Sequence, residues 1–465
     1  MVLSLFLQRL IDYEFSIVDL TYSPFLLFII FYFARSIRDR HILLEPEYKY
    51  FLPGLSVKIL GALMVAFIYN VYYSGGDTNY YFFDGRTMSR LLFKNFVWFG
   101  DLLFDGFSPD KMAYLDSSTG FFVYYRNAQT FFVVRVIWPF VLFGLQAMIP
   151  TALLFSVFTF GGVWRMFKVF ILEFPVLEKS FALAFFFVPS VFFWGSGILK
   201  DSITFSSLGY FFYSYYFAVI KRQNVFRNTI IIFLSLYVIV SIKPYIFVGI
   251  LPGSLIWVIS TYTSKIKGSF IRGISYPIIL IIGFFSGYFL LMVLSDELGK
   301  YSLERVLEEA VVTNKDLKSD YYKGNSFDIG EVKPTIESML EKSPAAINAA
   351  LFRPYITESN NVLMFISGLE NLFTLLFTIY ILFRVKVFGI FAYFNKHHLL
   401  TFSLIFSLFF AFSVGISTSN FGSLVRYRIP LLPYYIASLI IIKHFEDEAK
   451  KEKRDRKYTY YEAYG

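Results

Sequence analysis

Two carboxylates and an arginine follow directly on a long apolar run, in the stretch YYSGGDTNYYFFDGR at residues 72–86. Two glycines, which permit a tight turn, precede Asp77. Asp84 and Arg86 come soon afterwards. Charged side chains close to a bilayer are costly to keep there and are therefore candidates for function. A carboxylate at a partly desolvated position can act as a general base toward a hydroxyl group.

Further charged side chains lie at the ends of other apolar runs, on the face of the membrane that the charge pattern assigns to the outside. They are Lys200, Asp201, Lys243, Arg353, Glu358, Glu370, Arg426 and Arg428. Arginine and lysine groups can bind a phosphate or diphosphate and stabilise it as it departs. We therefore expect Asp77 to be a catalytic base. We expect the substrate to be bound by Asp84, Arg86, Lys200, Asp201, Lys243, Arg353, Glu358, Arg426 and Arg428.

Structural interpretations of the same residues stay open. Asp77 could cap a loop, and for Asp84 a structural role is favoured over a functional one. Lys200 and Asp201 could pair with each other. Lys243, which precedes a proline, could be an interfacial anchor.

The charged residues late in the chain also have both a structural and a functional interpretation. Glu370 lies inside an apolar run. A structural role is favoured for it over a functional one, because a helix N-terminus stabilises a negative charge. Arg426 and Arg428 flank Tyr427 at the start of the last span. Function is favoured for both arginines, because arginines on the outer face oppose the usual charge bias of membrane proteins.

Composition identifies the class of protein. The chain has 465 residues, of which 56% are hydrophobic and 22% aromatic, so lipid must be its main solvent. The absence of cysteine excludes disulfides, thiol nucleophiles and cysteine metal sites, and only four histidines occur. The net charge of +9 is attributed to cytoplasmic lysine and arginine rather than to nucleic-acid binding.

Apolar runs near the length of a bilayer span predict an all-α polytopic protein with about eleven transmembrane helices. The runs fall at 22–36, 55–73, 146–163, 179–194, 202–220, 228–242, 245–262, 275–294, 368–384, 399–416 and 429–443. Basic short loops, such as WRMFK at 164–168 and KRQNVFR at 221–227, alternate with the remaining loops. By the positive-inside rule, the N-terminus lies outside and the C-terminus in the cytoplasm.

The runs and loops together predict the domain organisation. An N-terminal transmembrane region covers 1–294 and contains an external loop, 74–130, with helices that lie in the membrane interface. An external, mixed-charge and partly helical subdomain follows at 295–366. A C-terminal transmembrane region covers 367–445, and a cytoplasmic tail covers 446–465.

Four segments carry a resemblance to a known superfamily: GGDTNYYFFDG (75–85), PSVFFWGSGILKDS (189–202), LFRPYITESNNVLMFISGLENL (351–372) and VRYRIPLLPYY (425–435). An acid in the first substantial external loop, many spans, interfacial helices and a basic outer pocket resemble the GT-C membrane glycosyltransferases. The chain is similar too to bacterial O-antigen and exopolysaccharide polymerases. The resemblance implies that Asp77 matches the first-loop acid that serves as base or metal ligand. It also implies that Arg426 and Arg428 match late external arginines that hold donor phosphate or growing glycan.

The resulting expectation is an integral membrane glycosyltransferase in cell-surface glycan synthesis. Its donor would be a sugar linked to polyprenyl phosphate or diphosphate at the periplasmic face of a bacterial inner membrane. The expected partners are the bilayer and a lipid-linked sugar or oligosaccharide, without nucleic acid. A divalent cation stays open as a cofactor, and no metal ligands are assigned. Two rivals stay open as well: a flippase or transporter of lipid-linked glycan, and a non-enzymatic membrane subunit of an envelope complex.

Overall fold

The fold is helical throughout the part of the chain that can be described. The computed structural model describes residues 16–263, 305–319, 325–385, 389, 393 and 397–464. Within these residues the only strand-like pairing is an isolated bridge between Ser326 and Asn420. The expected all-α class is therefore confirmed for the described residues.

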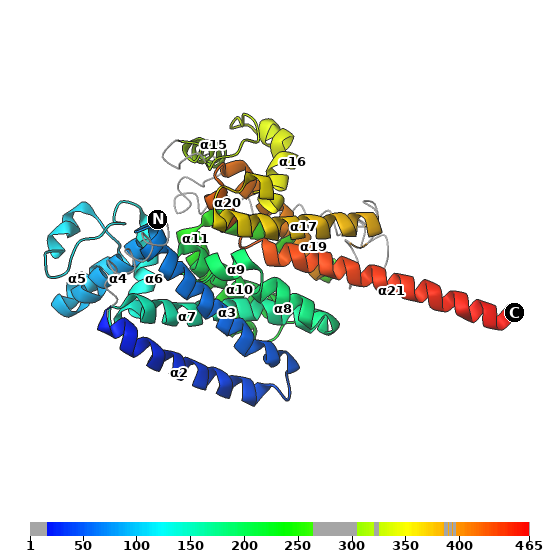
Figure 1. Cartoon of the computed structure of the whole chain (residues 1–465), viewed down its shortest axis with the longest axis horizontal. Coiled ribbons are helices and arrows are strands. Elements are labelled where there is room, and N and C mark those ends of the chain that lie inside the picture. The colour runs from blue at the N-terminus through cyan, green and yellow to red at the C-terminus, as the bar shows by residue number, and fades with distance from the viewer. Residues whose placement is uncertain are drawn as a thin grey trace. The chain divides into compact units, whose positions relative to one another are not determined.

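Figure 1 shows the order of the helices along the chain. Up to residue 186 the helical segments are α2 (Ile17–His41), η1 (Pro46–Tyr50), α3 (Phe51–Phe67), η2 (Ile68–Tyr72), α4 (Asp77–Lys94), α5 (Phe96–Phe104), η3 (Pro109–Tyr114), α6 (Ala128–Phe143), α7 (Met148–Glu173), η4 (Pro175–Leu177) and α8 (Glu178–Phe186). Further along they are α9 (Pro189–Trp194), α10 (Lys200–Tyr215), η5 (Tyr216–Ile220), α11 (Val225–Ile242), α12 (Pro244–Thr263), α15 (Val306–Asp316), α16 (Ile336–Phe352), η8 (Ile356–Glu358), α17 (Val362–Val385), α19 (His398–Ser417), α20 (Phe421–Tyr427) and α21 (Leu432–Tyr464).

Six of the described helical segments are long and apolar enough to cross a membrane. They are α2, Pro46–Tyr72, α7, α11, α17 and α19. A seventh span results if α20 and α21, which meet at a bend of 64°, are taken together. These helices indicate a multi-pass membrane protein, but the expected count of about eleven is not confirmed.

Individual apolar runs explain why fewer spans are observed than expected. The run expected at 179–194 is two short helices, because α8 ends at Phe186 and α9 begins at Pro189. Proline suits the first position of a helix but has no N–H with which to continue one. The helix α6, which matches none of the expected runs, is apolar but has only 16 residues. The run expected at 275–294 lies outside the described residues.

The chain divides into two compact units. The first unit comprises Met1–Val169 and Phe185–Pro244, and the second comprises Phe170–Ala184 and Tyr245–Gly465. The division expected from topology, with boundaries at 294, 366 and 445, stays a prediction.

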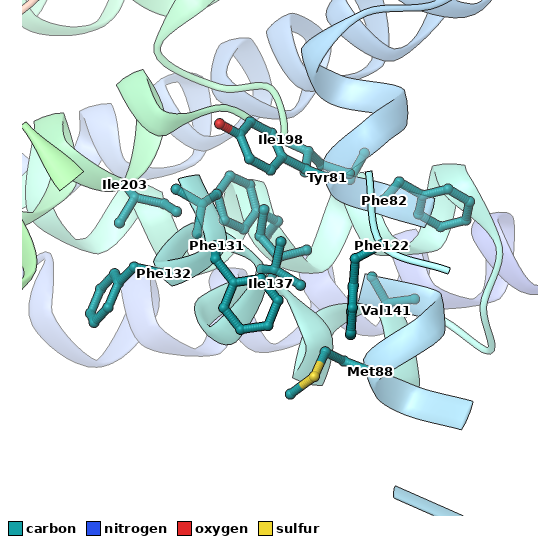
Figure 2. Packing of buried hydrophobic residues seen from close by; sticks show 14 of the residues in the cluster. Tyr81, Phe82, Met88, Phe122, Phe131, Phe132, Ile137, Val141, Ile198 and Ile203 are labelled. Carbon is teal, nitrogen blue, oxygen red and sulfur yellow. The ribbon is translucent and has the colours of Figure 1, made fainter. Parts of the chain in front are cut away.

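The first unit is organised around a cluster of buried apolar side chains. Tyr81 and Phe82 of α4 pack with Phe131 and Ile137 of α6 and with Ile203 of α10 (Figure 2). Asparagine side chains position two of these helices: Asn95 accepts backbone N–H bonds at the start of α5, and Asn127 does so at the start of α6. Such caps satisfy donors that have no partner inside the helix.

Two glycines let α7 and α10 cross at close range within this unit. A Cβ atom on Gly162 would lie 2.0 Å from the carbonyl oxygen of Ser206, and one on Gly209 would lie 2.1 Å from the carbonyl oxygen of Gly162. Small residues at helix crossings allow backbones to approach closely, as is common in membranes. Larger side chains at either glycine would force the two helices apart.

The second unit is a separate packing of helices. In it α16 packs against α17 and α19, α15 packs against α19, and α21 packs against both α17 and α19. The long α21, red in Figure 1, continues to Tyr464 and so includes residues 446–464 of the tail expected at 446–465.

Candidate functional site

Asp77 is the first residue of α4 and lies directly after a glycine turn. Gly75 and Gly76 have φ values of 144° and 113°, a region that side chains rarely adopt. The Asp77 side chain is half-buried, and its Oδ1 accepts a hydrogen bond of 2.7 Å from the Tyr124 hydroxyl. The turn and the hydroxyl therefore hold one carboxylate oxygen in place while the residue keeps access to solvent.

Asp84 lies two turns further along α4 and is completely buried. Its two carboxylate oxygens accept the backbone N–H groups of Val123 and Tyr124, each at 2.8 Å. Burial raises the pKa of Asp84 to about 6, against the lowering effect of these two hydrogen bonds. This carboxylate clamps the segment before α6 onto α4, which agrees with the structural interpretation favoured from sequence. On the same helix, the Arg86 guanidinium lies 5.6 Å from the centre of the Phe82 ring.

The residues expected from the segment 194–202 make contacts with other helices of the same unit. The Lys200 ammonium, at the start of α10, donates to the Thr130 hydroxyl at 2.8 Å. Asp201 forms a 2.5 Å ion pair with Lys243, the residue that directly follows α11. Both partners of this pair are buried, with 2% and 7% of their side chains exposed. A pair so enclosed ties the start of α10 to the end of α11.

The six expected residues of the first unit lie on, or directly after, helices α4, α10 and α11, each of which contributes side chains to its apolar cluster. Tyr81 packs on the Tyr124 ring, whose hydroxyl contacts Asp77, and Tyr81 belongs to the same cluster as Ile203 and Ile242 (Figure 2). Ile203 follows Asp201 by two residues, and Ile242 directly precedes Lys243. The arrangement combines one accessible carboxylate, Asp77, with the half-buried ammonium of Lys200.

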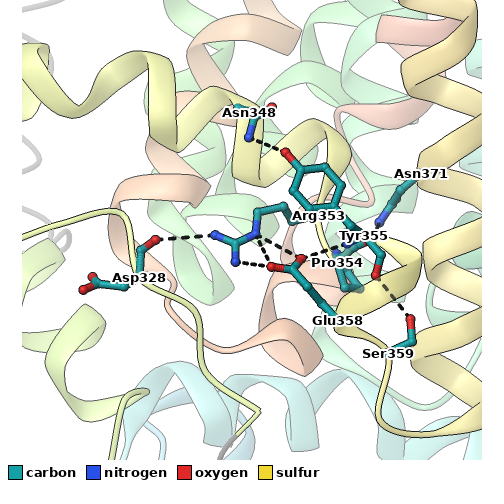
Figure 3. Close-up of polar contacts among 8 residues, drawn as sticks. All are labelled: Asp328, Asn348, Arg353, Pro354, Tyr355, Glu358, Ser359 and Asn371. Carbon is teal, nitrogen blue, oxygen red and sulfur yellow. Dashed lines mark hydrogen bonds and ion pairs between the residues drawn. The ribbon is translucent and has the colours of Figure 1, made fainter.

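Arg353 and Glu358 form a polar group of their own in the second unit. Figure 3 shows the Arg353 guanidinium directed at the Glu358 carboxylate, with Nε 3.1 Å from each oxygen and Nη2 also bonded. Burial raises the pKa of Glu358, but the Arg353 bonds and the Tyr355 N–H outweigh it, so the pKa is below its usual value. The guanidinium also lies 4.9 Å and 5.4 Å from the ring centres of Phe327 and Phe421. Arg353 is therefore held by an ion pair and by aromatic faces.

Arg428 is the largest completely buried side chain in the described part of the chain. Its Nη1 donates to the carbonyl oxygens of Ala350 and Arg353, at 3.3 and 2.9 Å. Its Nη2 donates to the Asn371 side chain and lies 3.5 Å from a carboxylate oxygen of Glu370. This guanidinium joins the break between α20 and α21 to the end of α16 and to α17.

Arg426 differs from Arg428 in exposure. It lies in the last turn of α20 and is half-buried, so it keeps access to solvent. Among the described residues of the second unit, Arg353 and Arg426 are thus the expected cations with accessible side chains.

Metal binding has no obvious centre in the part of the chain that the structure describes. No group of three or more histidine, aspartate or glutamate side chains there is arranged to hold a metal ion. The question of a divalent cation therefore stays with the sequence expectation.

Sequence reasoning missed three residues that hold the expected ones. Tyr124 lies in an aromatic stretch, FFVYY at 121–125, in which nothing distinguishes it from its neighbours. Thr130 is equally inconspicuous near the start of α6. Asn371 could have been found, because it is a polar residue next to Glu370 inside an apolar run.

Comparison of the chain with protein families, with curated proteins and with solved structures finds no match. Function is therefore inferred from the residues and their geometry.

Proposed function

We propose that the chain is an integral membrane glycosyltransferase of the GT-C or polymerase type. It takes a sugar from polyprenyl phosphate or diphosphate at the external face of a bacterial inner membrane. The proposal includes about eleven spans, an external N-terminus and a cytoplasmic C-terminus. The apolar helices support the membrane location, and the alternation of basic loops supports the orientation.

The observation that carries the proposal is the Asp77 carboxylate. It is half-buried and held by the Tyr124 hydroxyl, and it lies at the end of an apolar helical segment where a lipid-linked sugar would present its anomeric carbon. In the proposed reaction, Asp77 accepts the proton of an acceptor hydroxyl. The hydroxyl oxygen then bonds to the anomeric carbon, and the bond from that carbon to the phosphate oxygen breaks. The phosphate leaves with the electron pair.

A cation takes the leaving phosphate in this proposal. Lys200 is half-buried and lies in the same unit as Asp77. Ammonium and guanidinium groups stabilise negative charge as it develops on a phosphate. Arg428, which is enclosed by backbone carbonyls, Asn371 and Glu370, is assigned a positioning role instead.

One observation favours the rival of a non-enzymatic membrane subunit. Three ion pairs are formed among the expected charges: Asp201 with Lys243, Arg353 with Glu358, and Arg428 with Glu370. A purely structural role would leave the outer charges paired in this manner. Asp77, whose half-buried carboxylate accepts a hydrogen bond from the Tyr124 hydroxyl, is the residue whose substitution distinguishes the two functions.

The test is the substitution Asp77→Asn, which preserves shape and removes the charge. A positioned general base contributes about 10²–10⁴-fold in rate, so glycan formation should fall at least about 100-fold. The purified variant is assayed in nanodiscs with a lipid-linked oligosaccharide extract, and its melting temperature should equal that of the parent. Tyr124→Phe is the matched control, because it removes the hydrogen bond but keeps the base, and it should retain most activity. If Asp77→Asn keeps parental activity, Asp77 is not the base; if the parent forms no glycan, the subunit interpretation replaces the enzyme.

A further inference from the structure

A cavity of about 640 Å³ lies inside the first unit, between α2, α7, the end of α10 with η5, and α11. From α2 it is lined by apolar side chains alone, between Leu26 and Ile37. One of them, Phe33, is 61% exposed, so the cavity opens at the surface beside α2. Its volume is in the range of small-molecule sites, which is about 300–1,000 Å³.

The two ends of the cavity are defined by the parallel course of α2 and α7. At their starts, Asp19 of α2 accepts the backbone N–H of Ile149 at 2.8 Å. At their other ends, the His41 ring stacks on Tyr48, and the Lys168 ammonium lies 5.4 Å from the centre of the same Tyr48 ring. The lining residues nearest the C-terminal ends of α2 and α7 therefore lie at the same end of the cavity.

That shared end is basic. Arg165 and Lys168 line it from α7. Arg227 lines the cavity from the start of α11, which follows the end of α10, where the Tyr210 and Tyr213 rings contact Arg165. Lys168 is bonded to Glu45 at 2.7 Å. Arg165 instead donates to the Gly161 carbonyl at 3.1 Å and lies 4.4 Å from the Tyr210 ring centre.

Two of these cations lack an internal counter-ion. Among the described residues, neither Arg165 nor Arg227 forms an ion pair with a carboxylate. Arg165 is half-buried within a candidate membrane span, where an uncompensated charge is costly. An anion at the basic end of the cavity would supply the missing negative charge.

The apolar wall has the length of one bilayer leaflet. Leu26 and Ile37 are eleven residues apart on α2, which at 1.5 Å per residue is about 16 Å. The hydrocarbon core of a bilayer is about 30 Å thick, so one leaflet is about 15 Å. A single acyl chain of a phospholipid fills such a length, whereas a polyprenyl chain of many isoprene units exceeds it.

We propose that this cavity binds an anionic membrane phospholipid, with one acyl chain along α2 and α7 and its phosphate between Arg165 and Arg227. The basic segment 221–227, which ends at Arg227, predicts that this end faces the cytoplasm, where anionic lipids concentrate near Lys and Arg groups. The site is therefore separate from the one proposed around Asp77 and does not depend on the glycosyltransferase assignment.

The test measures the melting temperature of the purified chain in detergent with added phosphatidylglycerol or phosphatidylcholine. The parent should be stabilised more by phosphatidylglycerol than by phosphatidylcholine. Arg165→Gln with Arg227→Gln removes two charge-assisted bonds and should weaken phosphatidylglycerol binding at least about 10-fold. Arg38→Gln with Arg222→Gln is the matched control: it makes the same change in net charge at residues that do not line the cavity, and it should bind like the parent.

A second pair of variants tests the apolar part. Ala34→Trp fills the cavity, because Ala34 is buried in its wall, and should abolish the preference for phosphatidylglycerol. Phe28→Trp, on an exposed position of the same helix, should not. An equal loss of phosphatidylglycerol binding in the two double arginine variants would overturn the proposal. Stronger stabilisation of the parent by polyprenyl phosphate than by phosphatidylglycerol would overturn it as well. An unchanged preference in Ala34→Trp would overturn it too.

Discussion

Replacing Arg428 should destabilise the second unit strongly. The guanidinium is completely buried, and two backbone carbonyls, the Asn371 side chain and the Glu370 carboxylate all depend on it. The substitution Arg428→Met retains much of the volume but removes the charge and the donors. Glu370, with 5% of its side chain exposed, is then left as a buried carboxylate without this counter-ion.

The magnitude follows from this geometry. Removing one partner of a buried ion pair typically costs about 3–5 kcal/mol, because the remaining charge is uncompensated. For a unit of this size, each kcal/mol lowers the melting temperature by about 2–4 °C, so the expected decrease is on the order of 6–20 °C. Adding Glu370→Gln to Arg428→Met removes the stranded charge. The double variant should therefore recover stability, with a coupling of about 0.5–3 kcal/mol.

The assay uses the absence of cysteine from the chain. A single cysteine at Ala437, which is completely buried in α21, reports opening of the second unit by its reaction with a thiol dye during heating. Arg426→Met is the control, because Arg426 is also an arginine but is half-buried, and it should shift the midpoint little. All variants carry the same Ala437→Cys background.

A midpoint of Arg428→Met within about 2 °C of the parent would refute the stabilising network, since the expected cost would be absent. If that stable variant also formed no glycan, Arg428 would act on the substrate, as the sequence predicts. Failure of Glu370→Gln to restore stability would show that the lost carbonyl and Asn371 bonds, rather than the stranded carboxylate, dominate the cost.

Two further predictions concern Asp84 and the orientation. The folded-state pKa of Asp84, about 6, exceeds its usual 3.8, so the folded state binds the extra proton and stability falls by roughly 3 kcal/mol as pH rises between these values. The melting temperature of Asp84→Asn, which lacks this titration, should therefore be closer to the parent at pH 7.5 than at pH 4.5; a gap that widens with pH would contradict this. A reporter that fluoresces only in the cytoplasm should be bright at the C-terminus and dark when inserted after Gly330; fluorescence at Gly330 would reverse the orientation on which the external site depends.

Helix formation could be predicted well from this sequence, and span count less well. An apolar run identifies a helix, but it cannot by itself tell a membrane-crossing helix from a short buried one. The run at 179–194 illustrates this, because Pro189 starts a new helix and leaves two pieces too short to cross. The helix α6 is a second example. It is apolar and continuous, but its 16 residues are too few to cross a bilayer.

The candidate site was predictable as a set of residues but not as a set of partners. The cost of charge near lipid singles out Asp77, Asp201 and Arg428 from the sequence alone. Partners come from residues distant in the chain: Tyr124 is 47 residues from Asp77, and Lys243 is 42 residues from Asp201. No local pattern encodes such distances.

The partner nevertheless decides what each charge can do. Asp201 is neutralised by an ammonium and enclosed, so its carboxylate is already satisfied and is a poor base. Asp77 accepts a hydrogen bond from the Tyr124 hydroxyl but stays partly exposed, so an incoming hydroxyl can reach its carboxylate. This difference in exposure, rather than position along the sequence, is the physical reason to test Asp77 first.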